Sequence, residues 1–387
     1  MSQTTQWSRI SAERSYDRRE FLRGLSGAAL ATTVSSVMMP QKLWALNPDR
    51  RKTVVVTFGG GARDQETFAL EGQENIPFML KELLPQGAFF TQVVNRGILG
   101  HYVATASLAT GVYERFNNFA DVAPPNPTVF EYFRKARRRP TTDAWVIAPS
   151  NGFNRIGQSS HALYSGQGAS VVLPKRLLAH ADGSAAFTGL EHLLNDNYES
   201  PIQAPVALGT EIGTQQIASM LKLSMTDFAA HATTLSSPDE LSLFIARRVM
   251  RQFSPSLLWV TLHDIDVAHT GAFSLYVDGI RRSDKICAEL WNAIQSDPEY
   301  KDRTNLLIIP DFGRDSDTDA GGNGFQHHRT GDALSRTTWM VALGPGIRQN
   351  TVVDRPIESI DLAPSVAALL GCDAPMALGR PIRELGL

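Results

Sequence analysis

The sequence predicts an α/β fold, a three-layer α/β/α sandwich built on a mostly parallel sheet. Strand-like and helix-like segments alternate from residue 52 to the C-terminus, and most of the strands are continuous apolar runs. Such runs indicate strands that are buried on both faces, as in parallel sheets covered by helices on either side. The 387 residues are 43% hydrophobic, which is enough apolar material for a core of this kind.

The elements can be assigned in chain order. The β-branched run 52–58 is a strand that ends at three glycines, a segment with helical spacing follows at 75–84, and a second strand at 88–95. The remaining expected strands are 143–150, 256–262, 305–311 and 337–344, and the remaining expected helices are 103–111, 127–139, 273–296 and 361–371. For the last helix, Asp361 is the expected N-cap and Gly371 the expected C-cap.

Residues 151 to about 235 break this rhythm. They are rich in Gly, Ser, Asn and His and show no strong apolar period. Long irregular segments inside a compact domain are typically functional or mobile. We therefore expect one domain over 50–387 that carries an irregular insertion at about 151–235, over the sheet edge or the mouth of a site.

The N-terminal segment resembles a twin-arginine export signal. Arg18 and Arg19 open the hexapeptide RREFLR, and a weakly apolar run rich in Ala, Ser and Thr follows at once. The expectation is a signal over residues 1–47, the twin-arginine export machinery as a partner, and a periplasmic or otherwise exported protein. Because the apolar run is short and interrupted, no stable membrane span is expected after processing. The alternative is a surface helix with two chance arginines.

The overall charge argues against nucleic acid as a partner. The chain has 37 Lys and Arg residues against 39 Asp and Glu residues, so it has no strongly basic field. The two cysteines, Cys287 and Cys372, have neither CxxC nor zinc-finger spacing, and no structural disulfide is expected.

Ionisable residues follow several of the predicted strands. Ligands of an open parallel sheet bind beyond the carboxyl ends of its strands, where the connecting loops meet. The loops expected at this rim are FGGGARD, NRGILGH, HDIDVAH and PDFGRDSD. Charged groups at the mouth of a buried strand are costly unless a metal ion, a substrate or another charge pairs with them.

Two of these regions predict a metal site. Asp266 and His269 are three residues apart, so on a turn both can reach one ion, and Asp311 with the pair His327-His328 forms a second cluster. Carboxylates and imidazoles from separate loops suit one divalent ion, with zinc or manganese favoured, and leave a position open for water or substrate. The alternative is that the histidines pack in loops and the aspartates cap helices.

Calcium is less favoured. DSDTDAG (315–321) begins like a calcium-binding loop, but Ala320 stands at the sixth position and Gln326 at the twelfth, where such a loop has Gly and Glu.

Other polar residues leave two interpretations open. Arg314 could clamp an oxyanion or neutralise the neighbouring carboxylates. His101 and Thr105 stand in an expected helix N-terminus, which favours an anion or an activated nucleophile but is also an ordinary place for such residues. The three glycines 59–61 could approach an anion or simply form a tight turn.

Several motifs along the chain, in their order and spacing, resemble those of a known superfamily. The motifs are KTVVVTFGGGARD, NIPFMLKELLPQGAFFTQV, SLATGVYE, DVAHTGAFSLYVDGIRRSD, LIIPDFGRD, GFQHHRTGD and SIDLAPSVAALLG with GRPI. Together they resemble the alkaline phosphatase and sulfatase superfamily, over most of the chain from 52 to 385 except the insertion. The resemblance implies an α/β/α phospho- or sulfo-ester hydrolase or phosphomutase with two metal ions.

The chain also departs from that pattern. Gly59 stands where the superfamily has a metal-binding Asp, Phe312 where it has a His, and His101 where it has the nucleophile. Against the resemblance, these departures imply a single-ion site, or none, in place of the two-ion centre. The departures resemble an exported branch of the superfamily with a similar Phe-Gly-Arg turn and a histidine near the nucleophile position.

The matching residues are carried over one by one. The resemblance assigns one ion to His269, to Asp266 or Asp264, and to His327 or His328; Asp264 enters because the spacing from Asp266 to His269 is one residue shorter than usual. Only Asp311 remains of the second metal site.

The expected function is an exported hydrolase acting on a small anionic substrate, a phosphate or sulfate ester. Asp266, His269 and His328 would hold the ion and Asp311 would assist. His101 or Thr105 would be nucleophile or base, and Arg314 would bind the anion. The alternative is a catalytically degenerate periplasmic binding or scaffold protein of the same fold.

Overall fold

A computed structural model describes residues 51–120, 122–179, 193, 218–222, 224–318, 323–329 and 331–387. The predicted export signal and the central part of the predicted insertion lie outside these residues. None of the helices within the described ranges combines the length and the apolar character that crossing a membrane requires.

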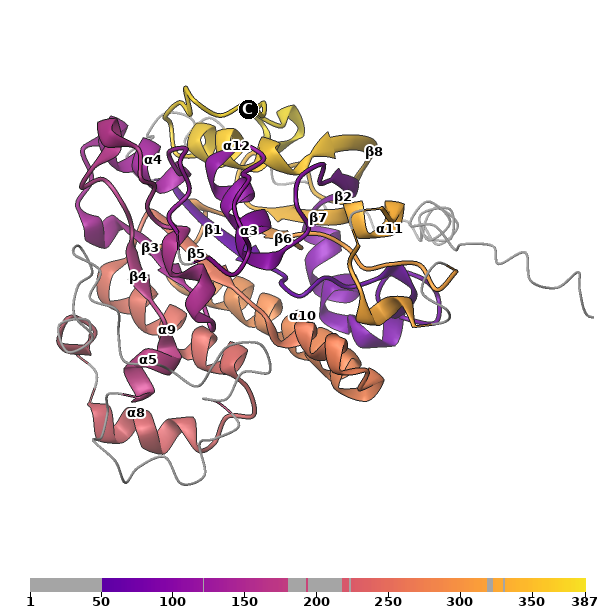
Figure 1. The fold of residues 1–387 in the computed structure, drawn as a ribbon. Helices are drawn as coiled ribbons and strands as arrows, with labels where there is room; N and C mark the ends of the chain where they lie inside the picture. Colours follow the sequence, from indigo (N-terminus) through magenta and orange to yellow (C-terminus); the bar gives the residue numbers. More distant parts are fainter. Residues whose placement is uncertain are drawn as a thin grey trace, which may run out of the picture.

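The described residues form a mixed sheet of eight strands in the order β4-β3-β5-β1-β6-β7-β2-β8 (Figure 1). The strands are β1 Lys52–Thr57, β2 Gly87–Val94, β3 Ala144–Ile147, β4 Ser170–Val172, β5 Leu257–Thr261, β6 Thr304–Ile309, β7 Thr337–Leu343 and β8 Thr351–Glu358. Only β7 runs against its neighbours β6 and β2, and every other adjacent pair is parallel. The predicted mostly parallel sheet is confirmed.

Helices cover both faces of the sheet, as the sequence predicted. One layer contains α3 His101–Thr110, α4 Val129–Arg137 and α12 Leu362–Leu369, and the other contains α9 Pro238–Phe253 and α10 Phe273–Ser296 (Figure 1). Strand β1 shows why both faces are apolar: Val54 and Val56 pack into the α9 and α10 layer, whereas Val55 packs into the α3, α4 and α12 layer. The shorter helices are α5 Pro174–Ala179, α8 Met225–Ala232 and α11 Ala333–Arg336.

Two details differ from the expectation. The segment 75–84 contains a π-helical turn, Met79–Leu83, followed by a 3₁₀ turn, instead of one continuous α-helix. The carboxylate of Asp284 on α10 accepts the backbone N–H of Phe78 and Met79 and so holds this turn. Asp361 flanks α12, but its carboxylate accepts N–H groups of Glu358 and Arg380 and does not cap the helix.

The region 151–235 contributes to the sheet. Its strand β4 pairs with β3 at one edge, and α5 follows directly. The unpredicted β8 lies at the opposite edge, where Pro356 is tolerated because no further strand needs its missing N–H. Helix α9 was also unpredicted, although Ser237 before Pro238 is a helix start signal and accepts the N–H of Glu240.

The strand directions bring four loops to one rim of the sheet. β5, β1 and β6 are parallel neighbours, and β2 has the same direction because two antiparallel pairings separate it from β6. The loops after β2 and β6 touch where Asn95 Nδ2 donates to the Asp311 carbonyl oxygen at 3.2 Å. The predicted meeting of these loops is therefore present.

Candidate metal centre

The glycines after β1 allow the rim loops to pack against one another. A Cβ at Gly59 would lie 1.8 Å from the Leu262 carbonyl oxygen, and one at Gly60 would lie 2.5 Å from the Asp266 nitrogen. Gly60 also has φ +100°, a conformation that other residues rarely adopt. This close contact between loops accounts for the glycine run, and no side chain fits at position 59, where the superfamily pattern has an Asp.

Asp266 and His269 lie together on a 3₁₀ turn, Asp264–Thr270, directly after β5. In a 3₁₀ helix, residues three apart lie on the same side. The three-residue spacing therefore lets the side chains of Asp266 and His269 converge. His269 Nε2 is 3.2 Å from Asp266 Oδ1, and the His269 side chain is 26% exposed.

His328 approaches from the loop that follows β6. Its Nε2 lies 2.8 Å from His269 Nε2, and its Nδ1 lies 2.9 Å from the Leu99 carbonyl oxygen. Because a carbonyl only accepts, Nδ1 carries the proton, and the lone pair on Nε2 faces His269. Burial, together with the positive charges of His101 and Arg314, lowers the pKa of His328 to about 2, which keeps the ring neutral.

His101, the first residue of α3, connects two buried carboxylates. Its Nδ1 lies 2.6 Å from Asp311 Oδ2 and its Nε2 lies 2.9 Å from Asp266 Oδ1. Burial alone would lower its pKa, but the charges of Asp266 and Asp311 outweigh burial and raise the pKa to about 9. His101 is therefore an imidazolium that donates from both nitrogens. Burial alone would raise the pKa of Asp266, but the contact with His101 holds that pKa well below its usual range.

Arg314 has no exposed surface, and all its nitrogens have partners. Nε donates to the Gly61 carbonyl at 2.9 Å, and Nη1 donates to the Phe325 carbonyl at 3.0 Å. Nη2 donates to Asp266 Oδ1 at 2.7 Å and also to the Gly60 carbonyl. This geometry favours the interpretation that Arg314 neutralises and positions a carboxylate over the expectation that it contacts an anion directly.

The other predicted site residues lie in different surroundings. Asp264 Oδ2 pairs with Arg282 at 2.7 Å, and His327 is exposed. Thr105 is buried one turn after His101, and its Oγ1 forms no hydrogen bond within the described part of the chain. The structure brings together four residues whose ligand atoms lie within 4.8 Å of one another: His101, Asp266, His269 and His328.

Sequence reasoning assigned no role to two residues next to this group. His263 Nε2 lies 3.4 Å from Asp266 Oδ2, at the start of the same motif. Its backbone N–H is held by the buried carboxylate of Asp239, at the start of α9. The start signal of α9 around Ser237 was the only indication of Asp239 in the sequence.

One divalent cation fits the donor set. Asp266, His269 and His328 offer one oxygen and two nitrogens, and the Leu99 carbonyl orients His328 from behind, as is usual for metal-binding histidines. A second cation does not fit. Position 59 has no side chain, Phe312 offers no donor, and Asp311 is bonded to His101.

Comparisons with known proteins agree with this architecture. No protein-family model and no curated protein matches the chain. The structure resembles wild-type alkaline phosphatase PafA, with 13% identity and a TM-score of 0.53 over 87% of this chain and 99% of that one. It also resembles the phosphonate monoester hydrolase of Agrobacterium radiobacter, with 13% identity and a TM-score of 0.52 over 87% and 77% of the two chains. The chain has the alkaline phosphatase fold.

A third solved structure with this fold is the lipoteichoic acid synthase LtaP from Listeria monocytogenes. It shares 12% identity and a TM-score of 0.51, over 87% of this chain and 76% of that one. At such identities the likeness concerns the alkaline phosphatase fold alone. The predicted resemblance is confirmed at that level, while the exported branch stays a prediction.

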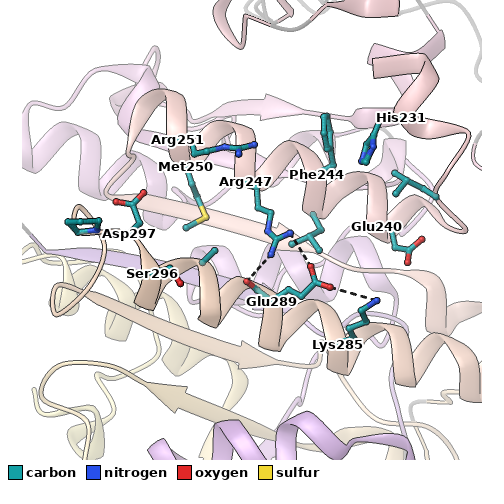
Figure 2. Close-up of a pocket in the computed structure, with 14 residues that line it drawn as sticks. His231, Glu240, Phe244, Arg247, Met250, Arg251, Lys285, Glu289, Ser296 and Asp297 are labelled. Carbon is teal, nitrogen blue, oxygen red and sulfur yellow. Dashed lines mark hydrogen bonds and ion pairs between the residues drawn. The ribbon is translucent and has the colours of Figure 1, made fainter. Parts of the chain in front are cut away.

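A separate hollow of about 780 Å³ lies between α8, α9 and α10 (Figure 2). Three of its charged residues pair with one another, since Glu289 contacts both Arg247 at 3.1 Å and Lys285 at 3.8 Å. It contains none of the predicted site residues, and we assign it no chemistry.

Proposed function

We propose that the protein is an exported hydrolase of a phosphate or sulfate ester that uses one divalent cation, zinc or manganese. Asp266, His269 and His328 would hold the cation. The observation that carries the proposal is the convergence of the two Nε2 atoms and Asp266 Oδ1 at the carboxyl rim of the sheet. Export would depend on residues 1–47 and the twin-arginine machinery.

A cation bound there would polarise an ester oxygen and lower the pKa of a bound water. The chain itself would supply fixed positive charge and orientation. The two ring nitrogens of His101 contact carboxylates and Thr105 is buried, so neither is placed for nucleophilic attack in this geometry. We therefore assign His101 the role of holding Asp266 in place.

The second candidate is a binding or scaffold protein that has the same fold without turnover. It is favoured by the full pairing of His101, Asp311 and Arg314, which leaves no activated side-chain nucleophile among the described residues near the rim. Metal content alone does not separate it from the hydrolase, because a binding protein can also hold a cation. Turnover does.

The test uses the purified full-length protein, its metal content, and aryl phosphates and aryl sulfates as probes. The hydrolase predicts about one zinc or manganese per chain and turnover that EDTA abolishes. The neighbouring histidines supply a matched pair of variants. His328→Ala should lose the metal and the turnover, whereas His327→Ala should keep both because His327 is exposed. A metal-bound protein without turnover of any probe would favour the binding protein, and an absence of metal would contradict the proposed site.

A further inference from the structure

We propose that the side chains of His101 and Arg314, which hydrogen-bond to the two buried carboxylates Asp266 and Asp311, take the place of a second metal ion. The centre then accepts one added cation, and Asp311 holds His101 without being a metal ligand. The inference deepens the proposed function and rests on it for the identity of the added cation.

The first step is charge balance. Asp266 and Asp311 are 4% and 1% exposed. Carboxylates buried to this degree are strongly destabilising unless a cation is close. The structure supplies partners from the chain itself, because the two ring nitrogens of His101 lie 2.6 Å from Asp311 and 2.9 Å from Asp266, and Arg314 donates to Asp266 at 2.7 Å. Both buried carboxylates thus have nitrogen partners within the protein before any ion is added.

The second step concerns the hydrogen bonds that Asp311 already accepts. Its Oδ2 accepts from His101 at 2.6 Å, and its Oδ1 accepts from the Phe312 N–H at 3.1 Å. Its carbonyl oxygen accepts from Asn95. The conformation of Asp311 is therefore already determined by protein donors, and a metal would have to replace them.

The third step is space. The Arg314 guanidinium reaches the carbonyls of Gly60 and Gly61, which follow the strand end that lacks the superfamily's Asp. On the other side the Phe312 ring packs against His101, with ring centres 4.6 Å apart, and against His328, with centres 4.7 Å apart. The guanidinium of Arg314 and the ring of His101 thus both contact Asp266, and the Phe312 ring covers His101, so that protein groups occupy the surroundings in which a second ion would need ligands.

The stoichiometry of metal binding tests the proposal. Metal-stripped full-length protein is titrated with Zn²⁺ by calorimetry, as wild type, Asp311→Asn and His269→Ala. We expect one equivalent for wild type, and one for Asp311→Asn with at most about 100-fold weaker binding, the range for a group that orients a ligand from behind. His269→Ala should lose binding. Two equivalents in wild type, reduced to one by Asp311→Asn, would overturn the proposal.

A second measurement needs no metal, so it separates this proposal from the proposed function. Thermal unfolding in EDTA is compared for Arg314→Met, Asp266→Asn and the double variant. Built-in neutralisation predicts that the double variant loses less melting temperature than the sum of the two single losses. Additive losses would overturn the proposal, even if wild type bound no zinc and the proposed function had failed. If Arg314→Met does not fold, Arg314→Lys replaces it, because that variant keeps the charge. Arg314→Lys should fold and bind one equivalent of Zn²⁺. Two equivalents in that variant would count against the proposal.

Discussion

The two halves of the candidate site differ in exposure and in hydrogen bonding. In the half formed by His269 and His328, the rings are partly exposed and their Nε2 atoms face each other at 2.8 Å. In the half formed by His101, Asp311 and Arg314, the side chains are 6%, 1% and 0% exposed, and each polar group has a protein partner. Asp266 belongs to both halves.

This difference is what the proposed one-ion site requires: protein donors satisfy one half, and the other half can take a cation. The buried half has the properties of a structural ion-pair network, because its charges are matched within the protein. In the partly exposed half, His328 Nε2 and Asp266 Oδ1 lie 2.8 Å and 3.2 Å from His269 Nε2, and such convergence of ligand atoms is the property of a ligand site. The predictions below test this division, from the largest expected effect to the smallest.

Removing the shared carboxylate should have the largest effect on stability. Asp266→Ala leaves the buried Arg314 without its carboxylate and leaves His101 with Asp311 alone, and the loss of one partner of a buried ion pair costs about 3–5 kcal/mol of unfolding free energy. Urea unfolding in EDTA measures this loss. Asp264→Ala is the matched control, because its partner Arg282 is 25% exposed and can regain water. Equal losses for both variants would contradict the division.

The dependence of stability on pH should contain one contribution from each half of the site, from His101 in the buried half and from His328 in the partly exposed half. The folded-state pKa of His101 is about 9, above the usual 6.5, so its stabilising contribution is complete below pH 6.5 and is lost as the pH rises through 9. The pKa of His328 is lowered to about 2, so its contribution is complete above pH 6.5 and is lost as the pH falls towards 2.

Denaturant unfolding across this pH range, in EDTA, checks the prediction. His101 should contribute on the order of 3 kcal/mol over the alkaline limb of the profile, which is the difference between a pKa of 6.5 and one of about 9. His101→Gln should flatten the alkaline limb and leave the acidic limb in place. An unchanged alkaline limb in that variant would show that His101 is not the cation we describe.

The loop contact behind the site should have an intermediate effect. Gly60→Ala combines strain at φ +100° with a Cβ 2.5 Å from the Asp266 nitrogen, and a strained backbone position alone costs about 1–3 kcal/mol. Gly166→Ala is the control, because Gly166 has φ +75° and open space around it. We expect Gly60→Ala to lose more unfolding free energy than the control and also to weaken zinc binding. A loss no larger than that of Gly166→Ala would show that the loops do not pack as described.

The smallest effect is expected for an ion pair of similar residue types on the surface. Arg247 and Glu289 lie 3.1 Å apart in the hollow of Figure 2, and their side chains are 41% and 30% exposed. A double-mutant cycle with alanine should give about 0.2–1 kcal/mol, because water and salt screen such pairs. A coupling as large as that between Arg314 and Asp266 would remove the distinction that we draw from burial.

The fold was predictable because apolar runs determine which segments are buried strands. The two missed strands have weaker patterns: β4 has three residues, and β8 contains Pro356 and charged residues that only an edge strand tolerates. The layers followed from the central strands, which carry the strongest signal.

The candidate site was predictable in part. The spacing of Asp266 and His269 indicated one cluster, but no pattern distinguishes His327 from His328, because neighbouring loop residues point in different directions. The role of Arg314 was equally open, since most of its partners are backbone carbonyls of Gly60, Gly61 and Phe325. Side-chain patterns do not encode such contacts, which depend on how separate loops meet.

The central claim is that one added cation binds on the His269 and His328 side, while His101 and Arg314 neutralise the other side. Anomalous diffraction from crystals grown with Zn²⁺ tests it most directly. We predict a single strong peak within ligand distance of Asp266, His269 and His328, with the Arg314 contact to Asp266 preserved. A peak coordinated by Asp311, or zinc-soaked crystals without a peak between the two histidines, would contradict the account.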